Sequence, residues 1–149
     1  MMINLENILE EWKNDAQIPQ HQLDEVSRQT PSLHAKYLHY LAVAKLQLKR
    51  AESQQYTLLK EKWLYYQGKM DQGRLRELGW DPDPFNGLKI LKGDMDYYYN
   101  SDPEIQSSEE RIAYNKTLIS TLTDIVDNLK WRHQTIKNMI TWRQFESGA

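Results

Sequence analysis

The chain has 149 residues, of which 40% are hydrophobic and 27% charged, and it contains no cysteine. This length suits one domain with a modest core, and the lack of cysteine excludes a disulfide framework and a thiolate metal site. No apolar run is long enough to span a bilayer, and the first residues lack the pattern of a signal peptide, so we expect a soluble intracellular protein with no membrane partner.

The net charge of −2 hides four blocks of alternating sign. Residues 1–32 carry 2 basic and 6 acidic side chains, and residues 33–92 carry 11 basic and 6 acidic ones. Residues 93–128 carry 2 basic and 8 acidic side chains, and residues 129–149 carry 4 basic and 1 acidic. Such alternation suits subunit pairing as well as polyanion binding, so the overall charge does not exclude a nucleic-acid partner.

Two helices are predicted in the first half of the chain. A short amphipathic helix is expected over about residues 3–14, where apolar residues fall on one helical face. A long helix is expected over about residues 32–67, because apolar residues recur at three- and four-residue steps and neither Gly nor Pro interrupts them before Gly68. Thr30 is the predicted N-cap of this helix, with Pro31 in its first turn.

Residues 68–101 are predicted to form a Gly/Asp-rich connection. Pro82 and Pro84 are incompatible with a helix running through them. Two short apolar stretches, Leu88–Lys92 and Met95–Tyr99, form either a small β-hairpin or an extended loop. A connection of this length is typically functional, mobile or ordered by a partner.

A second long helix is predicted over about residues 102–145, with Asp102 as its N-cap. Its apolar stripe is wider than a two-stranded seam, so a broad face is expected to be buried. The sequence thus indicates an all-α fold: a short N-terminal helix and two long helices in an antiparallel hairpin, within a single helical domain over residues 1–149. The residues expected to form an oligomer interface are Leu122, Ile125, Leu129, Ile136, Met139, Ile140 and Trp142.

Lysines and aromatic residues gather toward the end of the first long helix. Ammonium groups neutralise phosphates and aromatic rings stack on unpaired bases, so this combination is typical of a single-strand nucleic-acid binder. The alternative is an ordinary amphipathic helix end with a solvated lysine face. Lys62 lies about 200° around the helix from Lys60, so a groove that used both would wrap the helix end or involve a neighbouring subunit. The candidate residues are Lys45, Lys49, Tyr56, Lys60 and Trp63 on one face, with Lys62, Tyr65 and Tyr66 nearby.

No pattern in the sequence supports an enzyme, a metal site or a cofactor. The four histidines lack zinc or catalytic spacing, and no phosphate-binding Gly-x-x-x-x-Gly-Lys-Ser/Thr loop occurs. The acidic pair Asp81 and Asp83 has no neighbour that completes a divalent-metal site, and neither has Asp94 with Asp96. We therefore expect a non-enzymatic protein without a metal or cofactor.

Residues 55–148 carry three short motifs whose order and spacing point to a known family. They are Leu59-Lys-x-Lys-x-x-Tyr-Tyr-x-Gly68, Leu88-Lys-Ile-Leu-Lys-Gly-Asp94 and the terminal Arg143-x-Phe-Glu-x-Gly148. Together they resemble the UvsY family, the recombination mediators of T-even-type bacteriophages. The resemblance implies an all-α, non-enzymatic protein that forms a ring of six or seven subunits in the cytoplasm of the infected bacterial host.

The resemblance also implies a function. Such mediators bind single-stranded DNA, loosen the phage single-strand-binding protein from it and load the phage recombinase for homologous recombination, repair and replication. The alternative from the residues alone is a helical scaffold or adaptor that uses its charge blocks for protein partners and does not bind DNA. Salt-dependent DNA binding carried by Lys60 and Lys62 distinguishes the two.

The family's DNA-binding motif, Lys-Ala-Arg-Leu followed by Asp-Tyr-Tyr, corresponds here to residues 60–66, so the resemblance gives Lys60 and Lys62 a phosphate-binding role. Lys62 stands in place of an arginine and lacks its planar bidentate fork. Glu61 stands in place of a neutral alanine and is expected to weaken the local positive field. Trp63 replaces a leucine, and stacking on its ring is expected to compensate.

Overall fold

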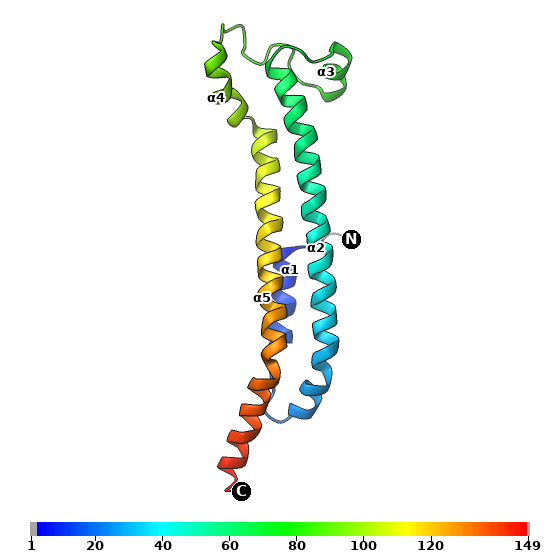
Figure 1. The fold of residues 1–149 in the computed structure, drawn as a ribbon, viewed down its shortest axis with the longest axis vertical. Coiled ribbons are helices and arrows are strands. Elements are labelled where there is room, and N and C mark those ends of the chain that lie inside the picture. The colour runs from blue at the N-terminus through cyan, green and yellow to red at the C-terminus, as the bar shows by residue number, and fades with distance from the viewer. Residues whose placement is uncertain (1–2, 149) are drawn as a thin grey trace. The chain divides into compact units, whose positions relative to one another are not determined.

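The computed structural model describes residues 3–148 and is all-α, which confirms the predicted fold class (Figure 1). No strand occurs among the described residues. The chain divides into two compact units. We call the described residues up to Leu48 and from Asn115 onward the core unit, and Lys49–Tyr114 the loop unit; the sequence had predicted a single domain. The elements are α1 (Leu5–Asp15), α2 (Leu23–Tyr66), α3 (Gln72–Leu78), the 3-10 turn η1 (Lys92–Asp94), α4 (Met95–Asn100) and α5 (Pro103–Glu146).

In the core unit, α1 and parts of α2 and α5 share a hydrophobic core (Figure 1). The α2 and α5 parts run antiparallel: Leu23, near the start of α2, packs with Ile136 toward the end of α5. Farther along α2, Gln47 Nε2 donates a hydrogen bond to Asn115 Oδ1 across 3.3 Å. Burial of apolar side chains between these helices is the main stabilising contribution. The buried residues of the larger cluster are Ile3, Ile8, Tyr37, Ala44, Leu118, Leu122, Ile125, Val126 and Leu129.

The first long helix begins at Leu23, about nine residues before the predicted start. Thr30 is not its N-cap: the Thr30 hydroxyl donates to the carbonyl oxygen of Val26 one turn earlier, across 2.8 Å. Pro31 therefore lies inside the helix, where its ring and missing N–H are unfavourable. Burial of Leu23 and Val26 in a second apolar cluster favours the added turns and offsets that cost.

In the loop unit, α2 ends in a turn that requires glycine. Gly68 has φ +71°. Its N–H donates to the Tyr65 carbonyl at 3.1 Å, and the N–H of Lys69 donates to the Leu64 carbonyl at 2.9 Å. This is a Schellman motif, which satisfies the last carbonyls of a helix and turns the chain away. The predicted end of the helix near residue 67 thus agrees with the structure.

The connection between the long helices contains helices that the sequence did not predict. Asp71 caps α3 by accepting the N–H of Arg74 at 3.2 Å, and Gly79 ends it in the left-handed region. The β-hairpin alternative is wrong, because Met95–Asn100 forms the helix α4. This segment is stabilised by hydrogen bonds within the helix and by contacts with α2. One of these contacts is a weak hydrogen bond of 3.4 Å from Gln67 Nε2 to Met95 Sδ.

The prediction for the second long helix agrees with the structure at both ends. α5 runs over Pro103–Glu146, and the short N-terminal helix runs over Leu5–Asp15, each within two residues of the expected bounds. Asp102 Oδ1 accepts the N–H groups of Glu104 (2.9 Å) and Ile105 (3.1 Å), as an N-cap does.

Candidate nucleic-acid interface

The exposed face of α2 in the loop unit carries four of the predicted DNA-binding residues: Lys49, Tyr56, Lys60 and Trp63. Tyr56 is 73% exposed and Trp63 49% exposed, which is unusual for large aromatic side chains. Within residues 3–148, neither Lys49 nor Lys60 has an acidic side chain at ion-pair distance. These lysines are therefore available to pair with an external anion. Lys45, in the core unit, is also exposed.

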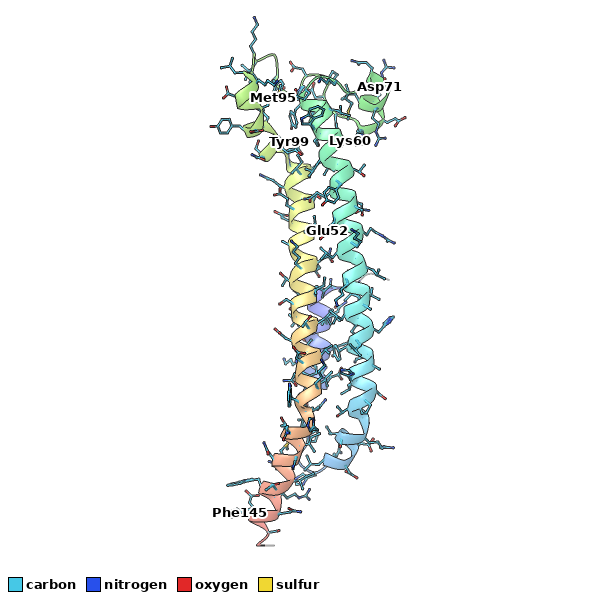
Figure 2. All side chains as sticks on the ribbon, viewed as in Figure 1. Glu52, Lys60, Asp71, Met95, Tyr99 and Phe145 are labelled. Carbon is cyan, nitrogen blue, oxygen red and sulfur yellow. The ribbon has the colours of Figure 1, made fainter. Side chains whose placement is uncertain are left out.

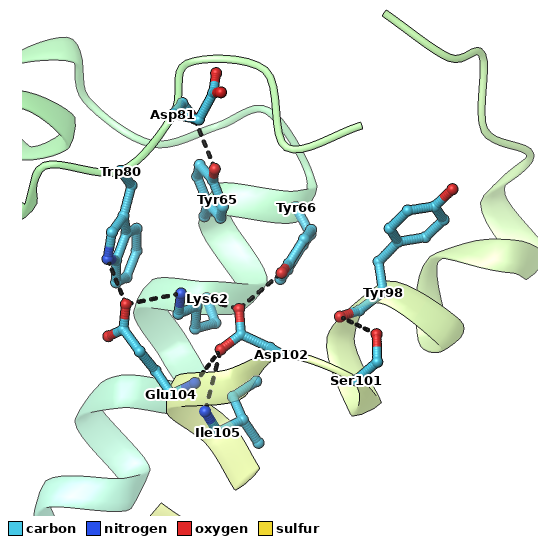
Figure 3. A network of polar contacts seen from close by, with 10 residues as sticks. All are labelled: Lys62, Tyr65, Tyr66, Trp80, Asp81, Tyr98, Ser101, Asp102, Glu104 and Ile105. Carbon is cyan, nitrogen blue, oxygen red and sulfur yellow. Dashed lines mark hydrogen bonds and ion pairs between the residues drawn. The ribbon is translucent and has the colours of Figure 1, made fainter. Parts of the chain in front are cut away.

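Lys62 has a different environment from Lys60, although only two residues separate them. Its side chain is only 5% exposed, and its Nζ lies 2.9 Å from Asp102 Oδ2 and 3.4 Å from Glu104 Oε1 (Figure 3). The ammonium also lies 3.9 Å from the ring centroid of Trp80, within cation–π distance. The predicted phosphate-binding role of Lys62 needs an accessible ammonium, and the structure instead commits this group to Asp102 and Glu104.

Asp102 is the centre of this network. Its Oδ2 accepts the Tyr66 hydroxyl at 2.7 Å as well as the Lys62 ammonium, while its Oδ1 caps α5 (Figure 3). Burial alone would raise the pKa of the Asp102 carboxyl, but the hydrogen bonds from Tyr66 and Lys62 outweigh it and hold that pKa below its ordinary value. The carboxylate thus ties the end of α2 to the start of α5 within the loop unit.

Tyr65 and Tyr66 are also engaged inside the loop unit. The Tyr65 hydroxyl donates to the Asp81 carbonyl oxygen at 2.6 Å, and its ring packs on Trp80 with centroids 5.0 Å apart. Burial raises the pKa of both tyrosines, helped at Tyr65 by the charge of Asp81 and at Tyr66 by the hydrogen bond to Asp102, so both hydroxyls stay neutral donors. In this structure the two rings support the fold around the motif and are not free for base stacking.

Glu61 does not stand unpaired beside Lys60. Arg74, on α3, donates to Glu61 Oε1 at 2.7 Å and to Glu77 Oε2 at 3.0 Å. These neighbouring carboxylates raise the pKa of Arg74, which stays charged. Because Arg74 compensates the charge of Glu61, the expected weakening of the local positive field is smaller than the sequence indicated.

The structure adds one cation that the sequence analysis did not single out. Lys69 Nζ lies 5.4 Å from the ring centroid of Trp63. Its position follows from the Gly68 turn, which brings the chain back beside the last turns of α2. The sequence did contain a signal for it, because a lysine directly after a helix-ending glycine lies close to the end of that helix.

The predicted oligomer-interface residues separate into two groups. Leu122, Ile125, Leu129 and Ile136 are at most 5% exposed and belong to the core unit's own apolar clusters, so they present no surface to another subunit. Met139 is half-buried, whereas Ile140 is 42% and Trp142 62% exposed. Trp142 stacks with Phe145 at 5.5 Å between ring centroids. Of the predicted interface residues, only Ile140 and Trp142, in the last turns of α5, are exposed.

No metal-binding arrangement exists among residues 3–148: no three ligating side chains gather closely enough to hold an ion. The acidic pair in the proline turn has a structural role, since Asp81 Oδ1 accepts the N–H of Asp83 (2.9 Å) and Asp83 Oδ1 that of Phe85 (3.0 Å). Among residues 3–148, no helix is both long enough and apolar enough to cross a bilayer.

Comparison with known proteins gives consistent results. Residues 11–149 match the family described as "Recombination, repair and ssDNA binding protein UvsY". The recombination protein uvsY of Enterobacteria phage T4 is 25% identical over 146 residues, covering 98% of this chain and 99% of that protein. Two crystal structures of the bacteriophage T4 recombination mediator protein UvsY also match. The lattice type II structure has a TM-score of 0.76 at 23% identity and covers 98% of this chain and 99% of its own. The lattice type IV structure has a TM-score of 0.75 at 24% identity and covers 97% of this chain and 99% of its own.

Proposed function

The chain belongs to the UvsY family of recombination, repair and single-stranded-DNA-binding proteins, and on this premise we propose that it is a recombination mediator. It binds single-stranded DNA, loosens the phage single-strand-binding protein and loads the phage recombinase in the cytoplasm of the infected bacterial host. It acts by binding and not as an enzyme.

The observation that carries the proposal is the exposed, cationic and aromatic face of α2. Lys49 and Lys60 have no acidic partner among the described residues, and Tyr56 and Trp63 present ring surface to solvent between and beside them. Lysines neutralise phosphates and aromatic rings stack on unpaired bases without regard to sequence, as a mediator requires. In this proposal Lys60 contacts phosphate, whereas Lys62, Tyr65 and Tyr66 hold the motif in place through their contacts within the loop unit.

A homo-oligomeric ring of six or seven subunits completes the mechanism. One such face makes few contacts and binds weakly, but linked sites raise the effective concentration of the strand at each subunit. A strand drawn over several subunits is bent, which disfavours the extended complex with the single-strand-binding protein. The exposed Ile140 and Trp142 at the end of α5 are the proposed association surface.

The test is fluorescence anisotropy of a labelled oligo-dT strand at several salt concentrations. Lys60→Ala is expected to weaken binding by roughly tenfold, since a charge-assisted contact is worth about 1.5 kcal/mol. It should also reduce the slope of log K against log salt by about 0.7 for each phosphate that the variant no longer neutralises. Lys116→Ala is the matched control, because Lys116 is exposed on α5 in the core unit and is not part of the proposed face.

Both variants should keep the oligomeric mass and helical content of the wild type. No binding of the wild type at low salt would contradict the proposal and favour the adaptor. Equally weakened binding in Lys60→Ala and Lys116→Ala would show that binding follows net charge and does not depend on the α2 face.

A further inference from the structure

A small pocket in the loop unit opens beside the proposed DNA-binding face. It lies between the last turns of α2, which supply Trp63, Tyr66 and Gln67, and the helix α4, which supplies Asp96 and Tyr99. Its volume is about 310 Å³, at the lower end of the roughly 300–1,000 Å³ of small-ligand pockets. The pocket is therefore of a size for one planar group, not for a longer stretch of a strand.

The aromatic walls of this pocket are held in place by the fold. The rings of Tyr66 and Tyr99 meet edge to face, with centroids 6.4 Å apart at 73°. The Tyr66 hydroxyl is fixed by Asp102, and burial raises the pKa of Tyr99, which keeps its hydroxyl neutral. Trp63 forms the half-exposed wall on the side of the DNA-binding face. Such a preformed site costs little ordering entropy when a flat ligand enters.

The polar groups of the pocket suit the edge of a nucleobase better than a phosphate. Asp96 is exposed and has no hydrogen bond or ion pair among the described residues, so its carboxylate can accept a base N–H but repels a phosphate. The Gln67 amide donates only to Met95 Sδ, a weak acceptor at 3.4 Å, and can exchange it for a base carbonyl.

One lysine lines the pocket and a second lies one helical turn from its Trp63 wall. Lys92, in η1, is exposed and lines the pocket, and Lys60 lies one turn before Trp63 on α2. Figure 2 labels Lys60 on α2 and Met95 and Tyr99 on α4, all in the loop unit. Aromatic rings and a hydrogen-bond acceptor in the lining suit a base, and Lys92 in the lining with Lys60 one turn away suits the phosphates of the same nucleotide.

We propose that this pocket receives one unstacked base of the bound single strand, with Trp63 and Tyr99 against the base and Asp96 at its hydrogen-bonding edge. The inference rests on the proposed DNA binding, and it adds a defined site for one base to the phosphate contacts and the open stacking of the α2 face. Thymine suits the site, because its N3–H can donate to Asp96 while a carbonyl accepts from Gln67.

The experiment compares oligo-dT with a strand of the same length that has the sugar–phosphate backbone but no bases, by anisotropy at fixed salt. The wild type is expected to prefer oligo-dT by roughly 5- to 150-fold, the range of one base–aromatic stack. Trp63→Leu should remove most of this preference while changing the affinity for the baseless strand little. Asp96→Ala should also lower the preference, while binding of the baseless strand becomes slightly tighter because a negative charge is removed.

Tyr97→Leu is the matched control. Tyr97 is an exposed aromatic residue on α4, adjacent to Asp96, and it does not line the pocket. The preference of this variant for oligo-dT over the baseless strand should equal that of the wild type. Lys60→Ala should weaken both strands equally. An unchanged preference for oligo-dT in Asp96→Ala, with salt-dependent binding of the wild type intact, overturns the pocket and leaves the proposed function standing. Failure to bind either strand overturns both.

Discussion

Lys60 and Lys62 show how two like residues on one helix acquire opposite roles. They lie about 200° apart around α2, so when one faces solvent the other faces the packed side. Lys62 is buried with Asp102 at 2.9 Å, and breaking such a pair by removing one partner typically costs about 3–5 kcal/mol. Lys60 has no such partner among the described residues and is free to be used in binding.

The buried pair makes stability depend on pH. The pKa of Asp102 is lower in the folded chain than its ordinary value of 3.8, so its contribution is present above that value and is lost as pH falls through the folded-state pKa. We expect Asp102→Asn, which keeps an N-cap acceptor, to lower the free energy of unfolding by roughly 3–5 kcal/mol near pH 7. Near pH 3 the difference from the wild type should be smaller. This difference in the free energy of unfolding is measured by urea denaturation at both pH values, with circular dichroism as the signal.

The control for this prediction is Asp71→Asn, which changes an exposed N-cap on α3 and should alter stability by less than about 1 kcal/mol at either pH. A destabilisation by Asp102→Asn that is the same near pH 7 and near pH 3 would mean that the carboxylate charge is not the source of the stability.

At the scale of the elements, the end of α2 determines which groups stand beside Trp63. The Gly68 turn reverses the chain and places Lys69 at 5.4 Å from the Trp63 ring. α4 then returns to the same helix end through Tyr99 and Met95. The binding face and the pocket therefore both depend on where and how one helix stops.

Gly68→Ala is expected to lower the free energy of unfolding by roughly 1–2 kcal/mol, because an L-residue with a Cβ is strained at φ +71°. The cost is conformational, since no neighbouring heavy atom lies within 4 Å of the added Cβ. Gly68→Asn should cost less, as asparagine tolerates the left-handed region. Urea unfolding of the three proteins gives the order, and equal stability of Gly68→Ala and the wild type would contradict the Schellman turn.

At the scale of the whole molecule, the surface that we propose for subunit association is narrower than the apolar stripe of α5. Most of that stripe is covered within the core unit, and exposed aromatic and aliphatic groups remain at its last turns, at Ile140, Trp142 and Phe145. Large exposed aromatic residues are frequent energetic centres of subunit interfaces.

Trp142→Ser is therefore expected to weaken subunit association by roughly 2 kcal/mol per interface, and to lower the affinity for long single strands through reduced avidity. Analytical ultracentrifugation measures the mass, and the monomer's helical content should be unchanged. Leu46→Ser, at a side chain 72% exposed on α2 in the core unit, is the control and should keep the wild-type mass.

Leu122→Ala separates association from folding. Leu122 is fully buried in the core unit, so truncation should destabilise the fold by about 2–5 kcal/mol. If Leu122→Ala instead lowered the oligomeric mass without lowering stability, the residue would belong to an interface and not to the core.

The sequence by itself determined the features that depend on local chemistry. Periodicity indicated the all-α class and the two long helices, Gly68 marked the end of α2, and Asp102 was recognisable as the cap of α5 from its place before Pro103. The exposed face of α2 also followed from spacing, because residues at helical intervals share a side whatever lies opposite.

Only the tertiary structure decided which side chains are held in contacts within the chain and which are available for binding. Three long-range contacts leave no local pattern in the sequence. Lys62 pairs with Asp102, forty residues later; other helices of the core unit bury Leu122; and α4 packs against the end of α2. Burial of Leu23 and Val26 likewise extended α2 through Pro31 against the local preference. Local sequence sets what a segment can form, whereas the free energy of burying and pairing distant side chains selects what each residue can still bind.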